Sequence, residues 1–132
     1  MCTVVIAEDE PLVAECIKAL LEDAGVRVVG VAADAGDAIE LAERHYPIVA
    51  ILDVKLAGAI DGATLADHLD VNYGIEIVFV TGDPLYVWRH AGNRRYQLLA
   101  KPFSDDELLK AVTTACAMAH AREVTVHQTT SA

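Results

Sequence analysis

Residues 3–11 read TVVIAEDEP, and apolar side chains change to acidic ones within these nine residues. The first five residues are apolar or β-branched, which is typical of a buried strand. Three acidic residues follow at once, and Pro11 suits the first turn of a helix. Apolar residues then recur at helical spacing as far as Gly25, a residue type that commonly ends helices. The stretch predicts a strand, an acidic loop and a helix in direct succession.

The same alternation of short apolar runs and helical spacing recurs along the chain. Further strands are expected at residues 26–33, 48–52, 75–80 and 96–100. Further helices are expected at residues 34–45, around Leu65 and Leu69, at residues 83–92, and from residue 105 to about Arg122. A capping box at Ser104-Asp105-Asp106-Glu107 begins the last of these helices. Because the strands are apolar on both faces, the sequence predicts an α/β fold with a doubly wound, five-stranded parallel sheet and helices on both faces.

Length and composition limit the class of protein. The chain has 132 residues, of which 54% are hydrophobic and 23% are charged, and this indicates one packed domain. We expect the domain to span residues 1–122 and residues 123–132 to form a polar, fraying C-terminal tail. Ten Lys and Arg against twenty Asp and Glu give a net charge of −10, so we expect no nucleic-acid partner. No long apolar run and no basic leader are present, so we expect no membrane partner and a cytoplasmic location.

The cysteines and histidines give no metal or disulfide pattern. Cys2, Cys16 and Cys116 are odd in number and widely spaced, so we expect reduced, small apolar residues rather than a disulfide framework or a zinc site. The five histidines show no pairing at metal-ligand spacing, which argues against transition-metal chemistry.

Acidic residues follow two of the expected strands. In the flavodoxin-like strand order, 2-1-3-4-5, the first and third strands are neighbours, so Glu8, Asp9 and Asp53 should crowd one end of the sheet. Two like charges about 4 Å apart cost roughly 4 kcal/mol at an effective dielectric near 20. A hard divalent ion with oxygen ligands relieves this repulsion, and Mg²⁺ fits a partly open site.

Thr81 and Lys101 follow the fourth and fifth strands, at the same end of the sheet. A hydroxyl, an ammonium group, Mg²⁺ and a carboxylate around one anion describe a phosphoryl-transfer site. The carboxylate of Asp53 would be the nucleophile.

Four motifs together make the sequence resemble the receiver domain of two-component response regulators, from residue 3 to about residue 121. They are Ile6-Ala7-Glu8-Asp9-Glu10-Pro11, Ile51-Leu52-Asp53-Val54, Val80-Thr81-Gly82 and Ala100-Lys101-Pro102-Phe103. The resemblance implies a stand-alone signalling protein, comparable to chemotaxis-type regulators, that drives a downstream protein target or drains phosphate from a shared kinase. It implies no enzyme activity beyond self-catalysed phosphorylation and dephosphorylation.

The resemblance also implies roles for individual residues. Asp53 would accept a phosphoryl group from a histidine kinase or a histidine phosphotransfer protein. Mg²⁺ would be held by Asp9, Asp53 and the backbone carbonyl of Lys55, with Glu8 acting through water. Thr81 and Lys101 would contact the phosphoryl oxygens, and the bond between Lys101 and Pro102 is typically cis in this family.

Leu98 departs from the family pattern, and Lys55 and Asp83 extend it. Leu98 stands where most receivers carry a switch Tyr or Phe, so either Tyr96 substitutes for it or the aromatic switch is absent, and Leu98 is expected to be ordinary packing. Lys55 and Asp83 each lie two residues after a site residue, and we hypothesise that they pair across the mouth of the site.

Aromatic and cationic residues gather between the fourth and fifth strands. Because such residues are enriched at protein interfaces, we expect a partner surface there. Its residues are Tyr86, Trp88, Arg89, Arg95 and Tyr96.

Three other functions compete with this interpretation. An aspartyl-phosphate hydrolase of the haloacid-dehalogenase type needs a second Asp where this chain has Lys55. A nucleotide-binding module needs a glycine-rich phosphate loop after the first strand, where Glu8, Asp9 and Glu10 stand instead. A receiver-fold interaction module that works without phosphorylation is the alternative that a labelling experiment would distinguish.

Overall fold

A computed structural model describes residues 2–130 of the chain and the side chains of residues 2–123. Five parallel strands form one sheet in the order β2-β1-β3-β4-β5, which confirms the predicted topology. The strands are β1 Thr3–Ala7, β2 Arg27–Ala32, β3 Val49–Leu52, β4 Glu76–Thr81 and β5 Gln97–Ala100. The helices are α1 Pro11–Asp23, α2 Ala35–His45, α3 Gly62–Tyr73, α4 Pro84–His90 and α5 Asp105–Thr130.

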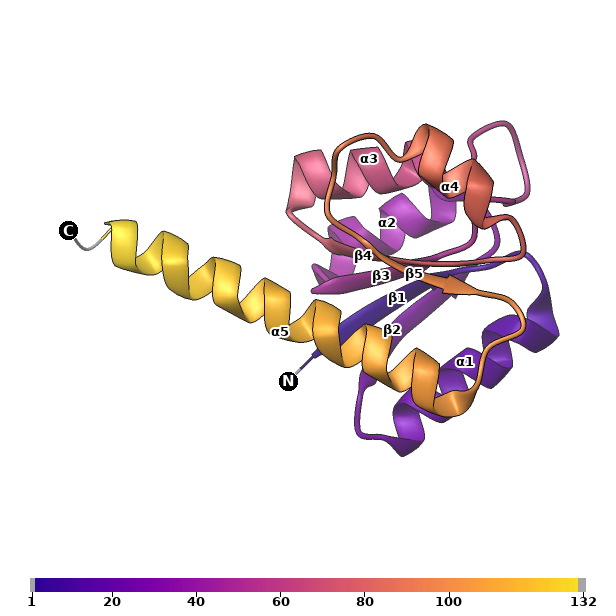
Figure 1. The fold of residues 1–132 in the computed structure, drawn as a ribbon, viewed down its shortest axis with the longest axis horizontal. Helices are drawn as coiled ribbons and strands as arrows, with labels where there is room; N and C mark the ends of the chain where they lie inside the picture. The colour runs from indigo at the N-terminus through magenta and orange to yellow at the C-terminus, as the bar shows by residue number, and fades with distance from the viewer. Residues whose placement is uncertain (1, 131–132) are drawn as a thin grey trace.

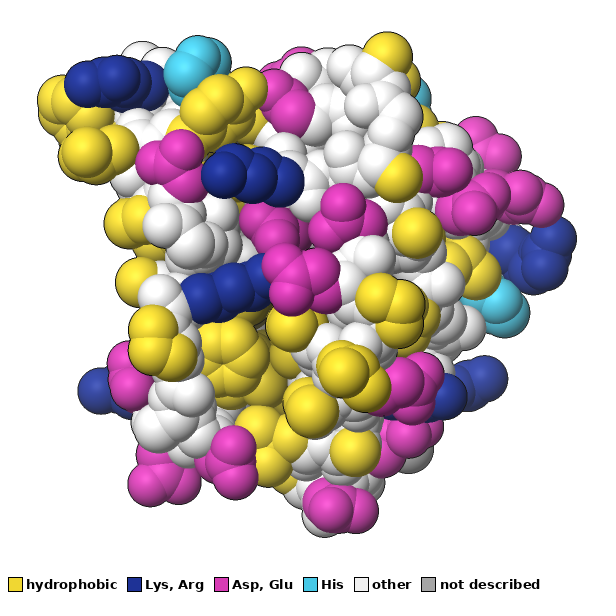
Figure 2. Space-filling view, turned by 90° about the vertical axis from the view of Figure 1, so that its right-hand side faces the viewer, with side chains coloured by type: hydrophobic (Ala, Val, Ile, Leu, Met, Phe, Trp, Pro, Cys, Tyr) yellow, Lys and Arg dark blue, Asp and Glu magenta, His cyan; other side chains and the backbone are white. Residues whose placement is uncertain are grey.

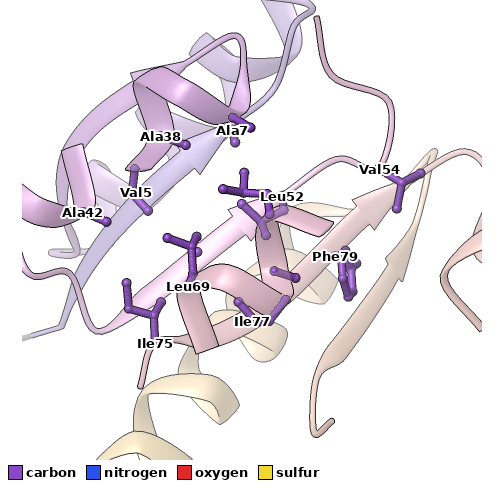
Figure 3. Packing of buried hydrophobic residues seen from close by; sticks show 14 of the residues in the cluster. Val5, Ala7, Ala38, Ala42, Leu52, Val54, Leu69, Ile75, Ile77 and Phe79 are labelled. Atoms are coloured by element: carbon purple, nitrogen blue, oxygen red, sulfur yellow. The ribbon is translucent and has the colours of Figure 1, made fainter. Parts of the chain in front are cut away.

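The helices cover both faces of the sheet, α2, α3 and α4 on one and α1 and α5 on the other (Figure 1). Successive residues of a strand point to opposite faces, so each buried strand supplies two cores. Val5 and Leu52 pack with α2 and α3 in the cluster drawn in Figure 3. Val4 and Ile51 pack on the opposite face with α1 and α5. Burial on both faces is why the central strands read as continuous apolar runs in the sequence.

Side-chain caps fix where the helices begin. The carboxylates of Asp34, Asp61 and Asp83 accept backbone N–H groups in the first turns of α2, α3 and α4, at 2.8, 2.8 and 3.2 Å. The capping box of α5 is confirmed: Ser104 Oγ accepts the Glu107 N–H at 3.1 Å, and the Glu107 carboxylate accepts the Ser104 N–H at 3.2 Å. Because all four caps follow a strand or the loop after it, they set the positions of the loops around the strand ends.

α5 is longer than the sequence predicted. It continues through the expected fraying tail as far as Thr130, and residues 131 and 132 of that tail lie outside the described residues. Its C-terminal half projects beyond the sheet (Figure 1). The predicted end of this helix near Arg122 was wrong because a polar stretch can extend a helix, and no Gly or Pro interrupts residues 105–130. Among the described residues, no helix, α5 included, has both the length and the apolar character that crossing a membrane requires.

The cysteine prediction was also wrong. Cys2 and Cys116 form a disulfide with their Cα atoms 6.1 Å apart, whereas Cys16 is a free, exposed thiol on α1. The two partners are separated by 114 residues in the sequence. Only the packing of α5 beside the start of β1 brings them together, and the spacing of cysteines along the chain gives no sign of that contact.

Candidate functional site

The predicted site residues lie where the strands end. Asp53 directly follows β3, Lys101 follows β5, and the acidic run that begins at Glu8 follows β1. A hollow of about 380 Å³ opens at this end of the sheet, lined by Asp9, Glu10, Asp53, Lys55, Gly82 and Lys101. Figure 2 looks onto this end of the molecule and shows acidic and basic side chains gathered at its centre. The structure therefore brings residues of four separate segments to one hollow.

Asp53 is buried and fixed at both carboxylate oxygens. Lys101 Nζ donates a hydrogen bond to Oδ2 at 2.9 Å, and the backbone N–H of Lys55 donates to Oδ1 at 3.2 Å. The Asp53 N–H donates to the carbonyl of Ala7 at 3.0 Å, which ties the end of β3 to β1. The hydrogen bonds thus hold the carboxylate in one orientation.

Lys101 also bridges Asp53 to Glu8. Its Nζ lies 3.1 and 3.2 Å from the two carboxylate oxygens of Glu8, which is buried. Burial and then the negative charge of Asp53 raise the pKa of Glu8 to about 7. Burial alone would lower the pKa of Lys101, but its hydrogen bonds to Asp53 and Glu8 raise it above the usual value, so Lys101 is an ammonium group. One cation therefore lies between two carboxylates.

Oxygen donors for a hard cation are present beside this pair. Carboxylate oxygens of Glu8, Asp9 and Glu10 all lie within 4.8 Å of one another. Asp53 is not part of that group, but it lines the same hollow as Asp9 and Glu10. A donor set made of oxygen atoms alone fits Mg²⁺. Glu10 was missing from the predicted ligand set, although the unbroken acidic run in the sequence could have suggested it.

Thr81 lies at the end of β4 with its side chain buried. Its Oγ accepts a hydrogen bond from the backbone N–H of Asp83 at 3.0 Å. The carboxylate of Asp83 caps α4, and among the described residues no ion pair joins it to the exposed Lys55. The hypothesised pairing of Lys55 and Asp83 across the mouth is therefore not seen in the described residues, where one oxygen of the Asp83 carboxylate accepts the Tyr86 N–H. The Lys101–Pro102 peptide bond is cis, as the resemblance implied.

The loop after Asp53 is packed directly against the site. The N–H of Gly62 donates to the carbonyl of Val54 at 2.9 Å, and a Cβ atom at Gly62 would overlap the backbone carbonyl of Asp53. The neighbouring Asp61 accepts a hydrogen bond from the Tyr86 hydroxyl of α4, in addition to capping α3. This link between α4 and the loop was not predicted, because the two residues are far apart in the sequence.

The residues of the predicted partner surface differ in how exposed they are. Trp88 is 73% exposed and Arg89 is exposed as well. The other three have internal partners: Tyr86 binds Asp61, Arg95 forms an ion pair with Glu76, and Tyr96 packs edge-on against Phe79 with the ring centroids 5.4 Å apart.

Leu98 does not form ordinary packing, contrary to the prediction. Its side chain is 40% exposed on β5. β5 is an edge strand, and α4, which lies on the corresponding side, is only seven residues long. Tyr96, two residues earlier, packs against the apolar cluster beneath α2, α3 and α4 instead. Tyr96, the aromatic residue closest in sequence to the usual switch position, therefore packs against Phe79.

Comparison with known proteins agrees with this geometry. The transcriptional regulatory protein PdtaR of Mycobacterium tuberculosis is 36% identical over 126 residues, which cover 92% of this chain and 59% of PdtaR. The phyllosphere-induced regulator PhyR of Methylorubrum extorquens is 29% identical over 113 residues, covering 85% of this chain and 42% of PhyR. The chain thus spans about half the length of these curated relatives.

Solved structures give the same result. The signal receiver domain of a modulated diguanylate cyclase from Desulfovibrio desulfuricans G20 superposes with a TM-score of 0.83 at 29% identity, covering 91% of this chain and 97% of that one. The response regulator PhyR from Brucella abortus also gives 0.83 at 29% identity, covering 96% of this chain and 52% of PhyR. The family model of the response regulator receiver domain matches residues 4–113 of this chain. The chain therefore belongs to the receiver domain family of two-component response regulators.

Proposed function

We propose that this receiver domain accepts a phosphoryl group on Asp53 from a histidine kinase or a histidine phosphotransfer protein of a cytoplasmic phosphorelay. The proposal rests on the surroundings of the Asp53 carboxylate. This carboxylate is buried, lies 2.9 Å from the ammonium group of Lys101, and lines a hollow large enough for a phosphoryl group. The relatives named above are regulators, which agrees with a signalling role rather than that of a conventional enzyme.

The chemistry follows from the groups around Asp53. A carboxylate oxygen attacks the phosphorus of a phosphohistidine, an O–P bond forms, and the P–N bond breaks as the imidazole leaves with the electron pair and takes up a proton from water. Lys101 stabilises the negative charge of the transferred oxygens, and the hydroxyl of Thr81 is a further donor at the end of β4. Because Lys101 already binds Asp53, it needs little reorganisation during transfer.

Glu8, Asp9, Asp53 and the backbone carbonyl of Lys55 would hold Mg²⁺, with Glu10 as an additional oxygen donor nearby. When bound, Mg²⁺ supplies the positive charge that offsets the crowded carboxylates and the phosphoryl oxygens. Removing either Asp9 or the metal should therefore slow the transfer.

Labelling with a small phosphodonor tests the proposal. The protein is incubated with acetyl phosphate in the presence and absence of Mg²⁺, and its intact mass is measured. We expect a gain of one phosphoryl group that requires Mg²⁺, is lost in Asp53→Asn and is kept in Asp23→Asn, which alters an exposed residue at the end of α1. A folded protein that gains no phosphoryl group would favour the phosphorylation-independent interaction module instead.

We further propose that a downstream protein contacts α4 near Trp88 and Arg89, which are exposed, so that phosphorylation changes partner binding. A purified partner should bind Trp88→Ala less tightly than the wild type, with acetyl phosphate labelling unchanged. A weaker labelling of Trp88→Ala would instead place this residue in the phosphoryl site. The expectation of a stand-alone receiver stays a prediction.

A further inference from the structure

The disulfide between Cys2 and Cys116 lies far from the phosphoryl site. Cys2 precedes β1, at the amino ends of the strands, whereas Asp53 and Lys101 lie at their carboxyl ends. Both cysteines are partly buried at the rim of the apolar cluster that α1 and α5 cover. No step of the proposed phosphoryl transfer uses them, so their pairing calls for a separate explanation.

The disulfide is accessible to small molecules. A hollow of about 240 Å³ lies beside it, lined by Cys2, Ile48, Cys116, Ala119, His120 and Glu123. His120 follows Cys116 by four residues and so lies one turn further along the same side of α5. A thiol or a disulfide of low molecular weight can therefore approach the two sulfur atoms from solvent.

The disulfide holds α5 at the point where the helix leaves the sheet. Before Cys116, the side chains of Leu108, Val112 and Ala115 are fully buried against the strands. After it, the attachments include the packing of Ala119 and a hydrogen bond from Gln97 Nε2 to Met118 Sδ at 3.4 Å. They also include the contacts of Arg122, which forms an ion pair with Glu76 at 2.9 Å and donates to the carbonyl of Gly74 at 3.1 Å. The disulfide to Cys2, just before β1, adds a covalent attachment at the start of this projecting part of α5.

We propose that Cys2 and Cys116 form a reversible thiol–disulfide site, exchanging with a low-molecular-weight thiol and disulfide such as glutathione, and that its oxidation state sets how firmly the second half of α5 is attached. Disulfides of cytosolic proteins are usually transient and redox-sensing, so a reversible site agrees with the cytoplasmic location in the proposed function. A permanent disulfide would be the expectation for a secreted protein.

The exchange balances in atoms and electrons. One cysteine thiolate attacks glutathione disulfide, a mixed disulfide forms, and one glutathione leaves as a thiolate. The second cysteine thiolate attacks the cysteine sulfur of the mixed disulfide, and the second glutathione leaves. Two cysteine thiols are oxidised, glutathione disulfide is reduced to two molecules of glutathione, and the two protons end on these products. Excess glutathione drives the reverse reaction.

A redox titration of the full chain tests the proposal. The protein is equilibrated with mixtures of reduced and oxidised glutathione, free thiols are trapped by alkylation, and the modified peptides are measured by mass spectrometry. We expect Cys2 and Cys116 to become protected together within the range of glutathione mixtures. The Cys16→Ser variant should behave in the same way, since Cys16 is exposed on α1. Free thiols in every mixture, or a disulfide that excess glutathione leaves intact, would overturn the proposal.

Hydrogen exchange measures the consequence for α5 and needs no cysteine variant. Amides of residues 113–123 should exchange at least about tenfold faster in the reduced than in the oxidised wild type, whereas those of β3 should change less. The Tm of the oxidised protein should be higher by up to about 17 °C, because the link closes a loop of more than a hundred residues in the unfolded chain. Equal exchange of residues 113–123 in both states would show that the disulfide does not control α5.

Discussion

Glu76 carries a buried carboxylate on β4, and removal of its two arginine partners should destabilise the fold. The Glu76 side chain is 3% exposed, and it pairs with Arg95 and with Arg122, the latter at 2.9 Å. The two arginines are 47% and 39% exposed, so water can solvate them when the carboxylate is absent. The carboxylate has no such access to water. The double variant Arg95→Met/Arg122→Met therefore leaves an uncompensated buried charge.

The size of the effect follows from this asymmetry. Removing the partners of a buried charge costs about 3–5 kcal/mol. An unfolding entropy of about 2.1 cal/mol/K per residue gives about 0.28 kcal/mol/K for 132 residues, so the Tm of the double variant should fall by about 11–18 °C. Adding Glu76→Met removes the buried charge, and most of the stability should return, because an apolar replacement of a buried ion cluster is often close to neutral.

Urea unfolding followed by far-ultraviolet circular dichroism measures these differences, with every variant in the same disulfide state. The triple variant should be more stable than the double variant, although it carries one more substitution. A double variant that loses less than about 1 kcal/mol would show that the carboxylate is hydrated in the folded protein. A triple variant no more stable than the double would show that charge burial is not the cause of the loss.

Substitutions at three further positions, Gly62, Glu8 and Ser104, have expected effects. Gly62→Ala should lower the unfolding free energy by about 1–3 kcal/mol and slow acetyl phosphate labelling, because the added Cβ would displace the backbone of Asp53. Wild-type stability of Gly62→Ala in thermal unfolding would contradict this. The pKa of Glu8 is raised from 4.5 to about 7, so the folded state binds this proton more tightly than the unfolded state does. In magnesium-free buffer the unfolding free energy should therefore fall by at most about 3 kcal/mol as pH rises from 4.5 to 7. Glu8→Gln should flatten this dependence on pH. The same pH dependence in Glu8→Gln and in the wild type would show that Glu8 is not the group that titrates. Ser104→Ala should cost about 1 kcal/mol in urea unfolding and Ser104→Gly only a few tenths, and an equal loss in both would argue against the N-cap.

The fold and the position of the site could be predicted because both depend on local patterns. Strands buried on both faces produce apolar runs, and each polar residue that ends such a run must lie at the same end of a parallel sheet. Asp53 and Lys101 are 48 residues apart, yet each directly follows a strand, so their meeting in one hollow followed from the topology.

Features that depend on contacts between distant side chains could not be predicted. The partner of Arg95 is Glu76 on the neighbouring strand, and nothing in the aromatic and cationic run that contains Arg95 indicates that its charge is already paired. The disulfide of Cys2 and Cys116 likewise depends on the packing of α5. The exposure of Leu98 depends on the short length of α4, which leaves part of the edge strand uncovered. Each case requires the positions of helices, which the alternation of residue types does not define.

The position of the phosphoryl group decides whether Asp53 is the phosphoryl acceptor. The protein is labelled with acetyl phosphate and Mg²⁺, the acyl phosphate is trapped by borohydride reduction, and the modified residue is identified by peptide mass spectrometry. We expect modification at Asp53 and at no other carboxylate, with none when Mg²⁺ is removed. Modification of Asp9 or of another carboxylate in place of Asp53, or an unmodified but folded protein, would contradict it.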